Sequence, residues 1–133
     1  MKPVSSRITR ALPVEAVIDV CDNSGAKRIK IFAVKGHKTV KGRLQAAGIG
    51  DMVYAAVKAG KPEMKKQTVN AIIVRQKKEF RRADGTRVKF EDNAAIILKD
   101  DKGNPKGTMV KGPVAKEVTL RWPMVAKICK IVV

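Results

Sequence analysis

The sequence is poor in the residues that most enzymes use for catalysis and metal binding. It contains one histidine, His37, and two cysteines, Cys21 and Cys129, which are far apart and have no CxxC spacing. These three side chains cannot complete a four-ligand site for a soft metal, and the cysteines are more typical of buried thiols than of a disulfide. No carboxylate lies within five residues of His37 to orient it as a base. We therefore expect no catalytic residue, no metal and no cofactor.

Glycine motifs and paired carboxylates do not change this expectation. Residues 48–51 (GIGD) precede an expected strand instead of following one, so they lack the context of a dinucleotide-binding loop. The adjacent carboxylates at 91–92 and 100–101 lie in turn-like sequence, where they cap turns or pair with lysine. A small phosphodiesterase that uses Asp51 with the pair at 91–92 is the enzyme alternative.

Long apolar stretches and aromatic residues are also scarce. The longest uninterrupted apolar run has six residues, 52–57, far fewer than the ~20 needed to span a bilayer. The first fifteen residues lack the apolar core of a secretory signal. Aromatic residues make up 4% of the chain, too few for a generous platform on which unpaired bases would stack. These absences argue against a membrane protein and disfavour a reader of single-stranded nucleic acid.

Acidic residues are few, and the resulting charge is the strongest feature of the sequence. The chain has 29 Lys and Arg against 12 Asp and Glu, a net charge of +17 in 133 residues. Residues 26–50 carry seven cations and no acid, and residues 58–89 carry eleven cations against three acids. Self-repulsion at this density favours a polyanionic partner, nucleic acid or an anionic membrane surface. The two blocks predict one binding face, provided that the fold brings them together.

Five basic clusters fall at expected strand ends or in loops, where rigid strands would hold them toward phosphates. A single basic cluster is as typical of a solvated surface as of a phosphate-binding one, but five clusters together favour phosphate binding. Because helix-turn-helix, zipper and finger spacings are absent, a reader of the shape and backbone of folded RNA is the favoured class. The residues that we expect to contact phosphates are Lys27, Arg28, Lys41, Arg43, Lys65, Lys66, Arg75, Lys77, Lys78, Arg81 and Arg82.

Hydrophobic periodicity predicts a mainly β protein. Residues 14–20 alternate between apolar and other side chains up to a turn at 22–25, and residues 28–33 alternate after it, which predicts a hairpin. Further strands are expected at 52–58, 69–80 and 94–98, with a second hairpin around Asp84-Gly85. Five or six short strands indicate an antiparallel barrel or a sandwich, and a barrel is preferred because it leaves no exposed edge.

The last part of the chain differs from the rest. Pro113 and Pro123 are each placed to be the first residue of a helix, which predicts two short helices within residues 111–133. At 133 residues the chain is expected to be a single domain, with the barrel and its basic loops in residues 1–110. An apolar stripe that includes Val125, Ile128 and Val132 is core packing by default, with a surface for a protein partner as the alternative.

Ordered motifs along nearly the whole chain resemble one known family. Residues 71–74 (AIIV), Asp84-Gly85, Phe90, Asn93 and residues 96–97 (II) are spaced as in its signature. Residues 22–26 (DNSGA), 48–51 (GIGD), 74–78 (VRQKK) and 112–114 (GPV) follow the same pattern. Together they are similar to the universal large-subunit ribosomal protein family numbered fourteen, in a form closer to its archaeal and eukaryotic members. Ile96 departs from the family's valine, a change in packing only.

The resemblance implies a five-stranded barrel with a small C-terminal helical region, bound to large-subunit rRNA in the cytoplasmic ribosome. It also implies a place at the subunit interface, with a bridge to small-subunit rRNA, and neighbouring ribosomal proteins as partners. In archaeal and eukaryotic relatives an anti-association factor docks largely on the C-terminal part. A structural ribosomal protein is thus the predicted function, and a free translation or RNA-binding factor is the alternative. Replacing Arg81 and Arg82 together by alanine is expected to weaken incorporation into the subunit while leaving the isolated fold intact.

Overall fold

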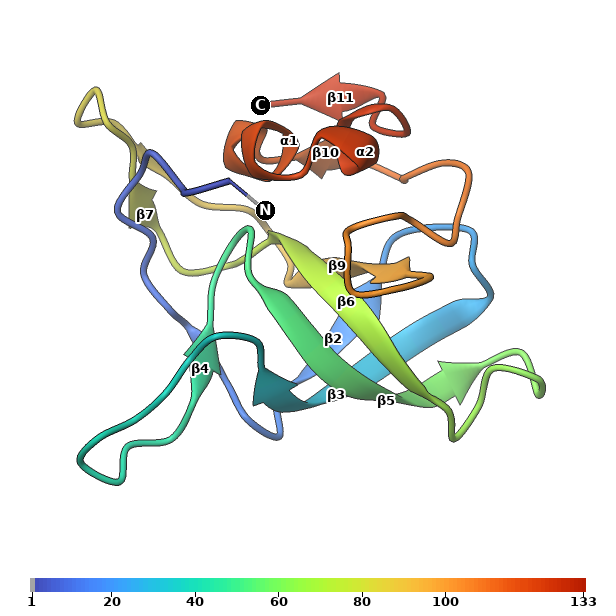
Figure 1. Cartoon of the computed structure of the whole chain (residues 1–133). Coiled ribbons are helices and arrows are strands. Elements are labelled where there is room, and N and C mark those ends of the chain that lie inside the picture. The colour runs from blue at the N-terminus through green and yellow to red at the C-terminus, as the bar shows by residue number, and fades with distance from the viewer. Residues whose placement is uncertain (1) are drawn as a thin grey trace.

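The computed structural model describes residues 2–133, in which five strands form a closed barrel (Figure 1). Around the barrel the strands follow the order β2, β3, β5, β6 and β9. Their bounds are Val17–Val20, Ala26–Val34, Met52–Gly60, Thr68–Arg75 and Ala94–Leu98 respectively. The predicted mainly β fold and its five-stranded barrel are confirmed.

Four of the five neighbouring pairs in the barrel are antiparallel, and the closing pair is parallel. Neighbours that alternate strictly in direction can close a ring only when their number is even, so a ring of five needs one parallel pair. Here Asp19 lies beside Ala94, and Val20 beside Ala95, at the junction of β2 and β9. Within the barrel, the predicted antiparallel arrangement therefore holds except at this junction.

Two hydrophobic cores result because β6 and β9 are apolar on both faces. Inward-facing residues such as Ile29, Ala71 and Ile97 fill the barrel and are fully buried. Their neighbours Ile72 and Ile96 point to the outer face, where they are buried beneath the C-terminal segment. The continuous apolar runs in these strands thus reflect a sheet that is covered on both sides.

Within residues 2–133, three two-stranded sheets extend the barrel. Strand β1 (Leu12–Pro13) pairs with β4 (Ala46–Ala47), and β7 (Phe80–Arg81) pairs with β8 (Arg87–Val88). The hairpin predicted around Asp84-Gly85 is the β7–β8 hairpin and is confirmed. The strand predicted over 69–80 ends at Arg75, and Phe80 belongs to the separate hairpin. The strand predicted over 14–20 begins only at Val17.

The C-terminal segment contains helices α1 (Lys116–Arg121) and α2 (Pro123–Ala126). Pro123 occupies the start of α2, as predicted. Pro113 was expected to begin a helix, which is wrong, because it lies in strand β10 (Pro113–Val114). This strand pairs in parallel with β11 (Ile131–Val132), which the sequence did not predict. Helices this short are stabilised by tertiary packing, here by Val118, Trp122 and Val125 in the outer core.

Candidate nucleic-acid interface

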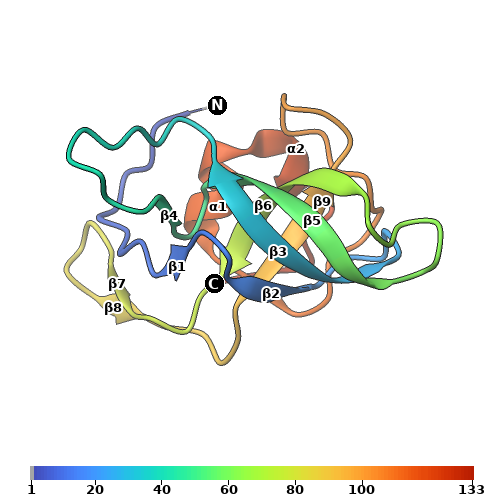
Figure 2. The same ribbon diagram turned by 90° about the horizontal axis from the view of Figure 1, so that it is seen from below.

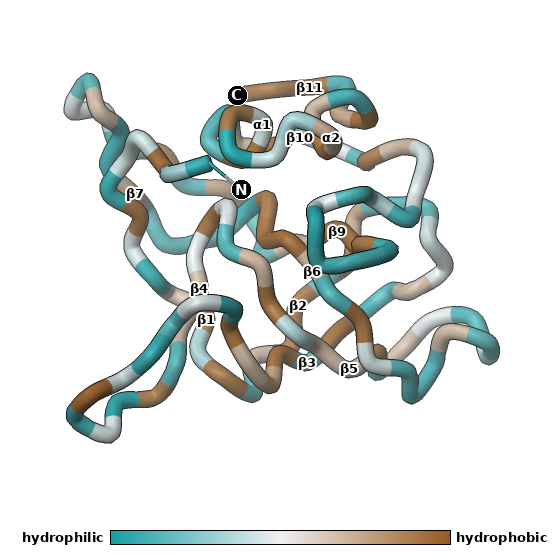
Figure 3. Tube along the Cα trace, viewed as in Figure 1, coloured by the Kyte–Doolittle hydropathy of each residue, from teal (hydrophilic) through white to brown (hydrophobic). Residues whose placement is uncertain are grey.

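Exposed cations gather on two long connections that project from one end of the barrel. The β3–β4 connection, residues 35–45, presents Lys35, Lys38, Lys41 and Arg43 to solvent. The β7–β8 hairpin presents Arg81 and Arg87. Both connections project to the same side in the two perpendicular views (Figures 1 and 2). Hydrophobic residues concentrate in the barrel strands, whereas the projecting connections are mostly hydrophilic (Figure 3).

The N-terminal segment joins these two connections into one surface. The backbone N–H of Arg7 donates to the carbonyl of Arg81 at 3.1 Å, and Leu12 pairs with Ala47 beside the β3–β4 connection. Arg7 and Arg10 are exposed along this path. We call the exposed cations at this end the hairpin-side surface; its members are Arg7, Arg10, Lys35, Lys38, Lys41, Arg43, Arg81 and Arg87. Arg7 and Arg10 were not among the predicted phosphate contacts, because only the fold brings the N-terminal segment between the connections.

A second group of cations lies at the opposite end of the barrel. The β5–β6 connection, residues 61–67, presents Lys61, Lys65 and Lys66, and it projects away from the hairpin side in both views (Figures 1 and 2). Lys27 belongs here, since Ala26 pairs with Gly60 at this end of β3 and β5. We call these four lysines the β5–β6 surface. The single binding face expected from the two charge blocks is therefore wrong: the fold separates the cations into two surfaces.

Two of the arginines predicted to contact phosphates are used inside the protein. Arg75 is 8% exposed, and its Nε lies 2.8 Å from Asp92 Oδ1. Its Nη1 donates to the carbonyls of Lys111 and Pro113 at 2.9 and 3.0 Å, which ties the C-terminal segment to β6. Bidentate, charge-assisted bonds of this kind hold the guanidinium in place. We therefore assign Arg75 a structural role and leave it out of the interface.

Arg82 is held in a similar way at the seam between the hairpin and α1. Its Nε donates to Glu117 Oε1 at 2.8 Å, and Nη2 also reaches Glu117 and the carbonyl of Val133. The Glu117 side chain is 1% exposed and accepts a further bond from the Ser6 hydroxyl at 3.2 Å. A carboxylate this deeply buried needs its partner, so removing Arg82 would disturb the fold. We expected the fold to stay intact when Arg81 and Arg82 are replaced. For Arg82 we now expect a loss of stability.

The other predicted cations are exposed, but some have acidic neighbours. Arg28 lies 3.5 Å from Asp19, with both side chains more than half exposed, and Lys78 lies 3.3 Å from Glu79. Exposed pairs of this kind contribute at most about 1 kcal/mol and can be exchanged for a phosphate. Lys77 is exposed in the same hollow as Arg28. Lys78 adjoins the N-terminal segment of the hairpin side, since Gln76 Nε2 donates to the carbonyls of both Thr9 and Lys78 at 3.0 Å. Arg28, Lys77 and Lys78 are not counted in the two surfaces defined above and remain candidates.

The apolar stripe predicted for a protein partner is divided by the structure. Val125 is fully buried in the outer core, so its contribution is to packing. Ile128 is partly buried against the same core, and Val132 in β11 is 49% exposed. Of the three, Val132 is the side chain most open to a protein neighbour.

The groups that enzymes would use are also held by internal contacts. Asp51 accepts a bond from the Gly48 backbone N–H at 2.9 Å and pairs with Arg121 at 3.1 Å. Burial raises the pKa of Cys21 to about 12, which keeps this thiol protonated. Within residues 2–133 no group of three or more His, Cys, Asp and Glu is arranged for a metal ion. In the same range, no helix is long and apolar enough to cross a membrane.

These features define a small, strongly basic β-barrel protein whose exposed cations suit a polyanionic partner. A family model described as ribosomal protein L14p/L23e matches residues 11–133. The chain therefore belongs to the ribosomal protein L14p/L23e family, and the resemblance seen in its motifs is confirmed. Membership also confirms the expected ribosomal location, which is cytoplasmic in archaea.

The sequence is similar to those of individual archaeal relatives over essentially its full length. The chain is 59% identical to the large ribosomal subunit protein uL14 of Nanoarchaeum equitans, over 133 residues and 100% of both chains. It is 54% identical to the protein of that name from Methanococcus maripaludis over 132 residues, and 52% identical to that from Methanococcus vannielii, with 99% of each chain covered.

Proposed function

We propose that the chain is a structural constituent of the large ribosomal subunit that binds large-subunit rRNA through its two basic surfaces, without catalysis. The observation that carries this proposal is the division of exposed cations between the two ends of the barrel. Residues 35–45 contain four cations and no acid, and they are fixed at both ends by strands β3 and β4. The two strands hold the ends of this loop, so its charges stay close to one end of the barrel.

Cations at both ends suit contact with two separate RNA segments. Phosphates of two segments repel one another, and a rigid barrel with positive charge on both sides offsets that repulsion where the segments approach.

We further propose a place at the subunit interface, where the chain contributes to a bridge with small-subunit rRNA. Neighbouring large-subunit proteins and an anti-association factor would use the C-terminal region. The exposed apolar side chains of Leu120, Met124 and Val132 in that region support a protein-contacting role. The bridge itself rests on the family resemblance.

Sedimentation after a high-salt wash tests the assignment to the subunit. The full chain, tagged in its native host, is expected to stay with the large subunit through a wash that strips transient translation factors. Release into the supernatant together with such factors would favour the alternative, a free translation or RNA-binding factor. A known constituent and a known factor serve as the two markers.

The bridge is tested separately by subunit association. Large subunits that carry charge-removing changes in the chain's exposed cations should form fewer complete ribosomes at limiting Mg²⁺, while the large subunits themselves remain intact. Unchanged association for every exposed cluster would remove the bridge from the proposal and leave rRNA binding in place.

A further inference from the structure

Two of the few aromatic residues lie side by side on the outer face of the barrel. The rings of Phe32 in β3 and Tyr54 in β5 are 6.5 Å apart between centroids, with 26° between their planes. Phe32 is 50% exposed although phenylalanine has no polar group that water could satisfy. This pair is not visible in the sequence, because the two rings are 22 positions apart in the chain and only the β3–β5 pairing brings them together.

The pairing of strands continues this row across the sheet. Tyr54 is paired with Asn70 in β6, and Asn70 is paired with Leu98 in β9. The next outward residues along β6 and β9, Ile72 and Ile96, lie beneath the C-terminal segment and are fully buried. The outer face of the sheet is therefore covered on one part and open where the aromatic rings begin.

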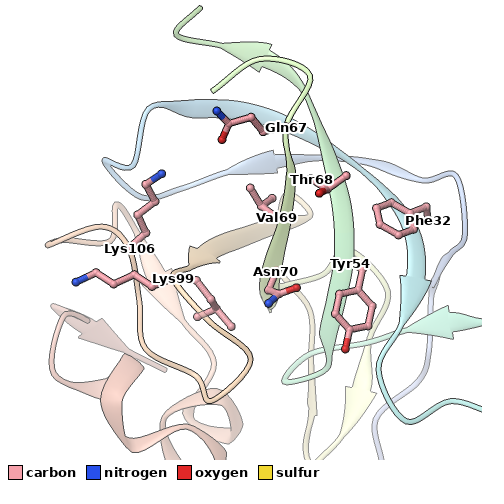
Figure 4. A pocket seen from close by; sticks show the side chains of 9 residues that line it. Phe32, Tyr54, Gln67, Thr68, Val69, Asn70, Lys99 and Lys106 are labelled. Atoms are coloured by element: carbon pink, nitrogen blue, oxygen red, sulfur yellow. The ribbon is translucent and has the colours of Figure 1, made fainter. Parts of the chain in front are cut away.

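The open part is a hollow of about 400 Å³ that is mostly polar around the aromatic rings. Figure 4 shows Phe32 and Tyr54 on one side, Lys99 and Lys106 on the other, and Asn70 between them. Its volume falls in the range of ~300–1,000 Å³ that is usual for sites holding small ligands. Both lysines are exposed, so the rim of the hollow opposite the rings is positively charged.

The rings, the Asn70 amide and the two lysines together indicate which kind of group the hollow binds. Flat rings attract another flat ring, the Asn70 amide has both a donor and an acceptor for the edge of a base, and the two ammonium groups attract phosphates. An apolar side chain from a protein would offer no hydrogen bond to the amide and no negative charge to the lysines. We propose that this hollow accepts one unstacked base of the ribosomal RNA, with the base against Phe32 and Tyr54 and its flanking phosphates near Lys99 and Lys106.

The proposal rests on the proposed binding to rRNA and deepens it, since it adds a site that holds a base to surfaces that hold phosphates. The two kinds of contact differ in their response to salt. Each lost phosphate contact lowers the slope of log affinity against log salt by about 0.7–0.9, whereas lost stacking leaves the slope unchanged. Stacking can therefore be measured separately from charge.

Ultraviolet crosslinking of intact large subunits tests the occupant without any substitution. After digestion with nuclease and trypsin, mass spectrometry should find a nucleotide adduct on peptide 31–35, which contains Phe32, or on peptide 44–58, which contains Tyr54. Adducts confined to peptides of the basic loops would overturn the proposal and leave the proposed function standing. A chemical crosslink from Lys99 or Lys106 to a neighbouring protein that occupies the hollow would also overturn it.

Two double variants of the full chain, assayed on a transcript of the large-subunit rRNA, give the second test. Phe32→Leu with Tyr54→Leu should lower affinity by about five-fold or more with the salt slope unchanged, as expected for loss of base stacking. Lys99→Gln with Lys106→Gln is the matched control and should lower the slope by up to about 1.8. Phe32→Leu alone, at a half-exposed position, provides the measurement if the double variant unfolds.

The outcomes distinguish the site from the function. Undiminished affinity for both leucine variants, in protein whose melting is unchanged, would overturn the base site. If the unaltered chain shows no salt-dependent affinity for the transcript, the proposed function itself fails.

Discussion

Arginine has opposite uses in two regions of the molecule. One region is the C-terminal seam, where Arg75, Arg82 and Arg121 join the C-terminal segment to the rest of the protein, and the other is the hairpin-side surface. At the seam, Arg75, Arg82 and Arg121 are buried or nearly so, and each pairs with a carboxylate at 2.8–3.1 Å. On the hairpin-side surface, Arg43, Arg81 and Arg87 are exposed. The same side chain therefore fastens the C-terminal segment to the barrel in one region and is available to phosphates in the other.

The difference follows from what surrounds each side chain. The seam arginines lie at the rim of the outer core, where apolar residues exclude water and an unpaired charge would be costly. The hairpin-side arginines extend from loops into solvent, where the charge costs little and stays free to bind. Changes at the seam should thus act on stability, and changes on the surface should act on affinity and its salt dependence.

The binding role of the exposed cations is tested by the salt dependence of rRNA affinity, where we expect the strongest response. If six to ten phosphates are engaged, the affinity of the full chain for large-subunit rRNA should fall by roughly three to five decades between 50 and 200 mM salt. Filter binding or fluorescence anisotropy over this salt range measures it. A loss of less than about one decade would mean that few phosphates are contacted.

The seam is tested next by Glu117→Gln, which keeps the shape of the side chain but removes its charge. Arg82 then loses its ionic partner, and the free energy of unfolding should fall by about 3 kcal/mol. Urea denaturation of the isolated chain measures this fall. Glu91→Gln, at an exposed position, is the control and should change stability by less than about 0.5 kcal/mol. Equal stability of the two variants would contradict a structural role for the seam pair.

Packing at the seam is tested by Gly103→Ala. A Cβ at this position would lie 2.6 Å from Trp122 Cε3, and the φ angle of +98° disfavours any side chain. The expected loss of stability is about 1–3 kcal/mol. Gly42→Ala in the β3–β4 connection is the matched control, since its φ is +69° and no atom lies within 4 Å of the added Cβ. Similar losses in both variants would show that backbone strain acts alone.

The smallest effect concerns the two thiols of the outer core. Cys21 is buried and its pKa is raised to about 12, whereas Cys129 is only partly buried. Iodoacetamide at pH 8 should therefore alkylate Cys129 before Cys21 in the folded chain, and both at similar rates in urea. Mass spectrometry of timed samples reads out the order. Faster reaction at Cys21 would show that the outer core opens readily.

The strands were predictable where side-chain alternation or a strong turn sequence marked them. The hairpin at Asp84-Gly85 is an example, whereas the strand over 94–98 was predicted from its continuous apolar run. The β1–β4 and β10–β11 sheets were not predictable, because strands of two residues carry no periodicity. Pro113 illustrates the same limit, since a fixed φ suits the start of a helix and an extended strand alike.

The candidate site was predictable in composition but not in arrangement. Counting charges identified Lys41, Arg43 and Arg81 correctly as exposed cations. It could not separate Arg82 from Arg81, because the partner of Arg82 is Glu117, which is 35 positions away in the sequence. The joining of the N-terminal segment to the hairpin, and the separation of the β5–β6 surface, likewise depend on the closed barrel.

The neighbouring residues Arg81 and Arg82 allow the most direct test of the division between anchoring and binding cations. Arg81→Gln and Arg82→Gln would each be measured for urea stability and for the salt dependence of rRNA affinity. Arg81→Gln should reduce the salt slope by about 0.7–0.9 with unchanged stability. Arg82→Gln should lose stability by about 3 kcal/mol while its folded form keeps the full slope. A reduced slope for Arg82→Gln with normal stability, or an unchanged slope for Arg81→Gln, would contradict the account.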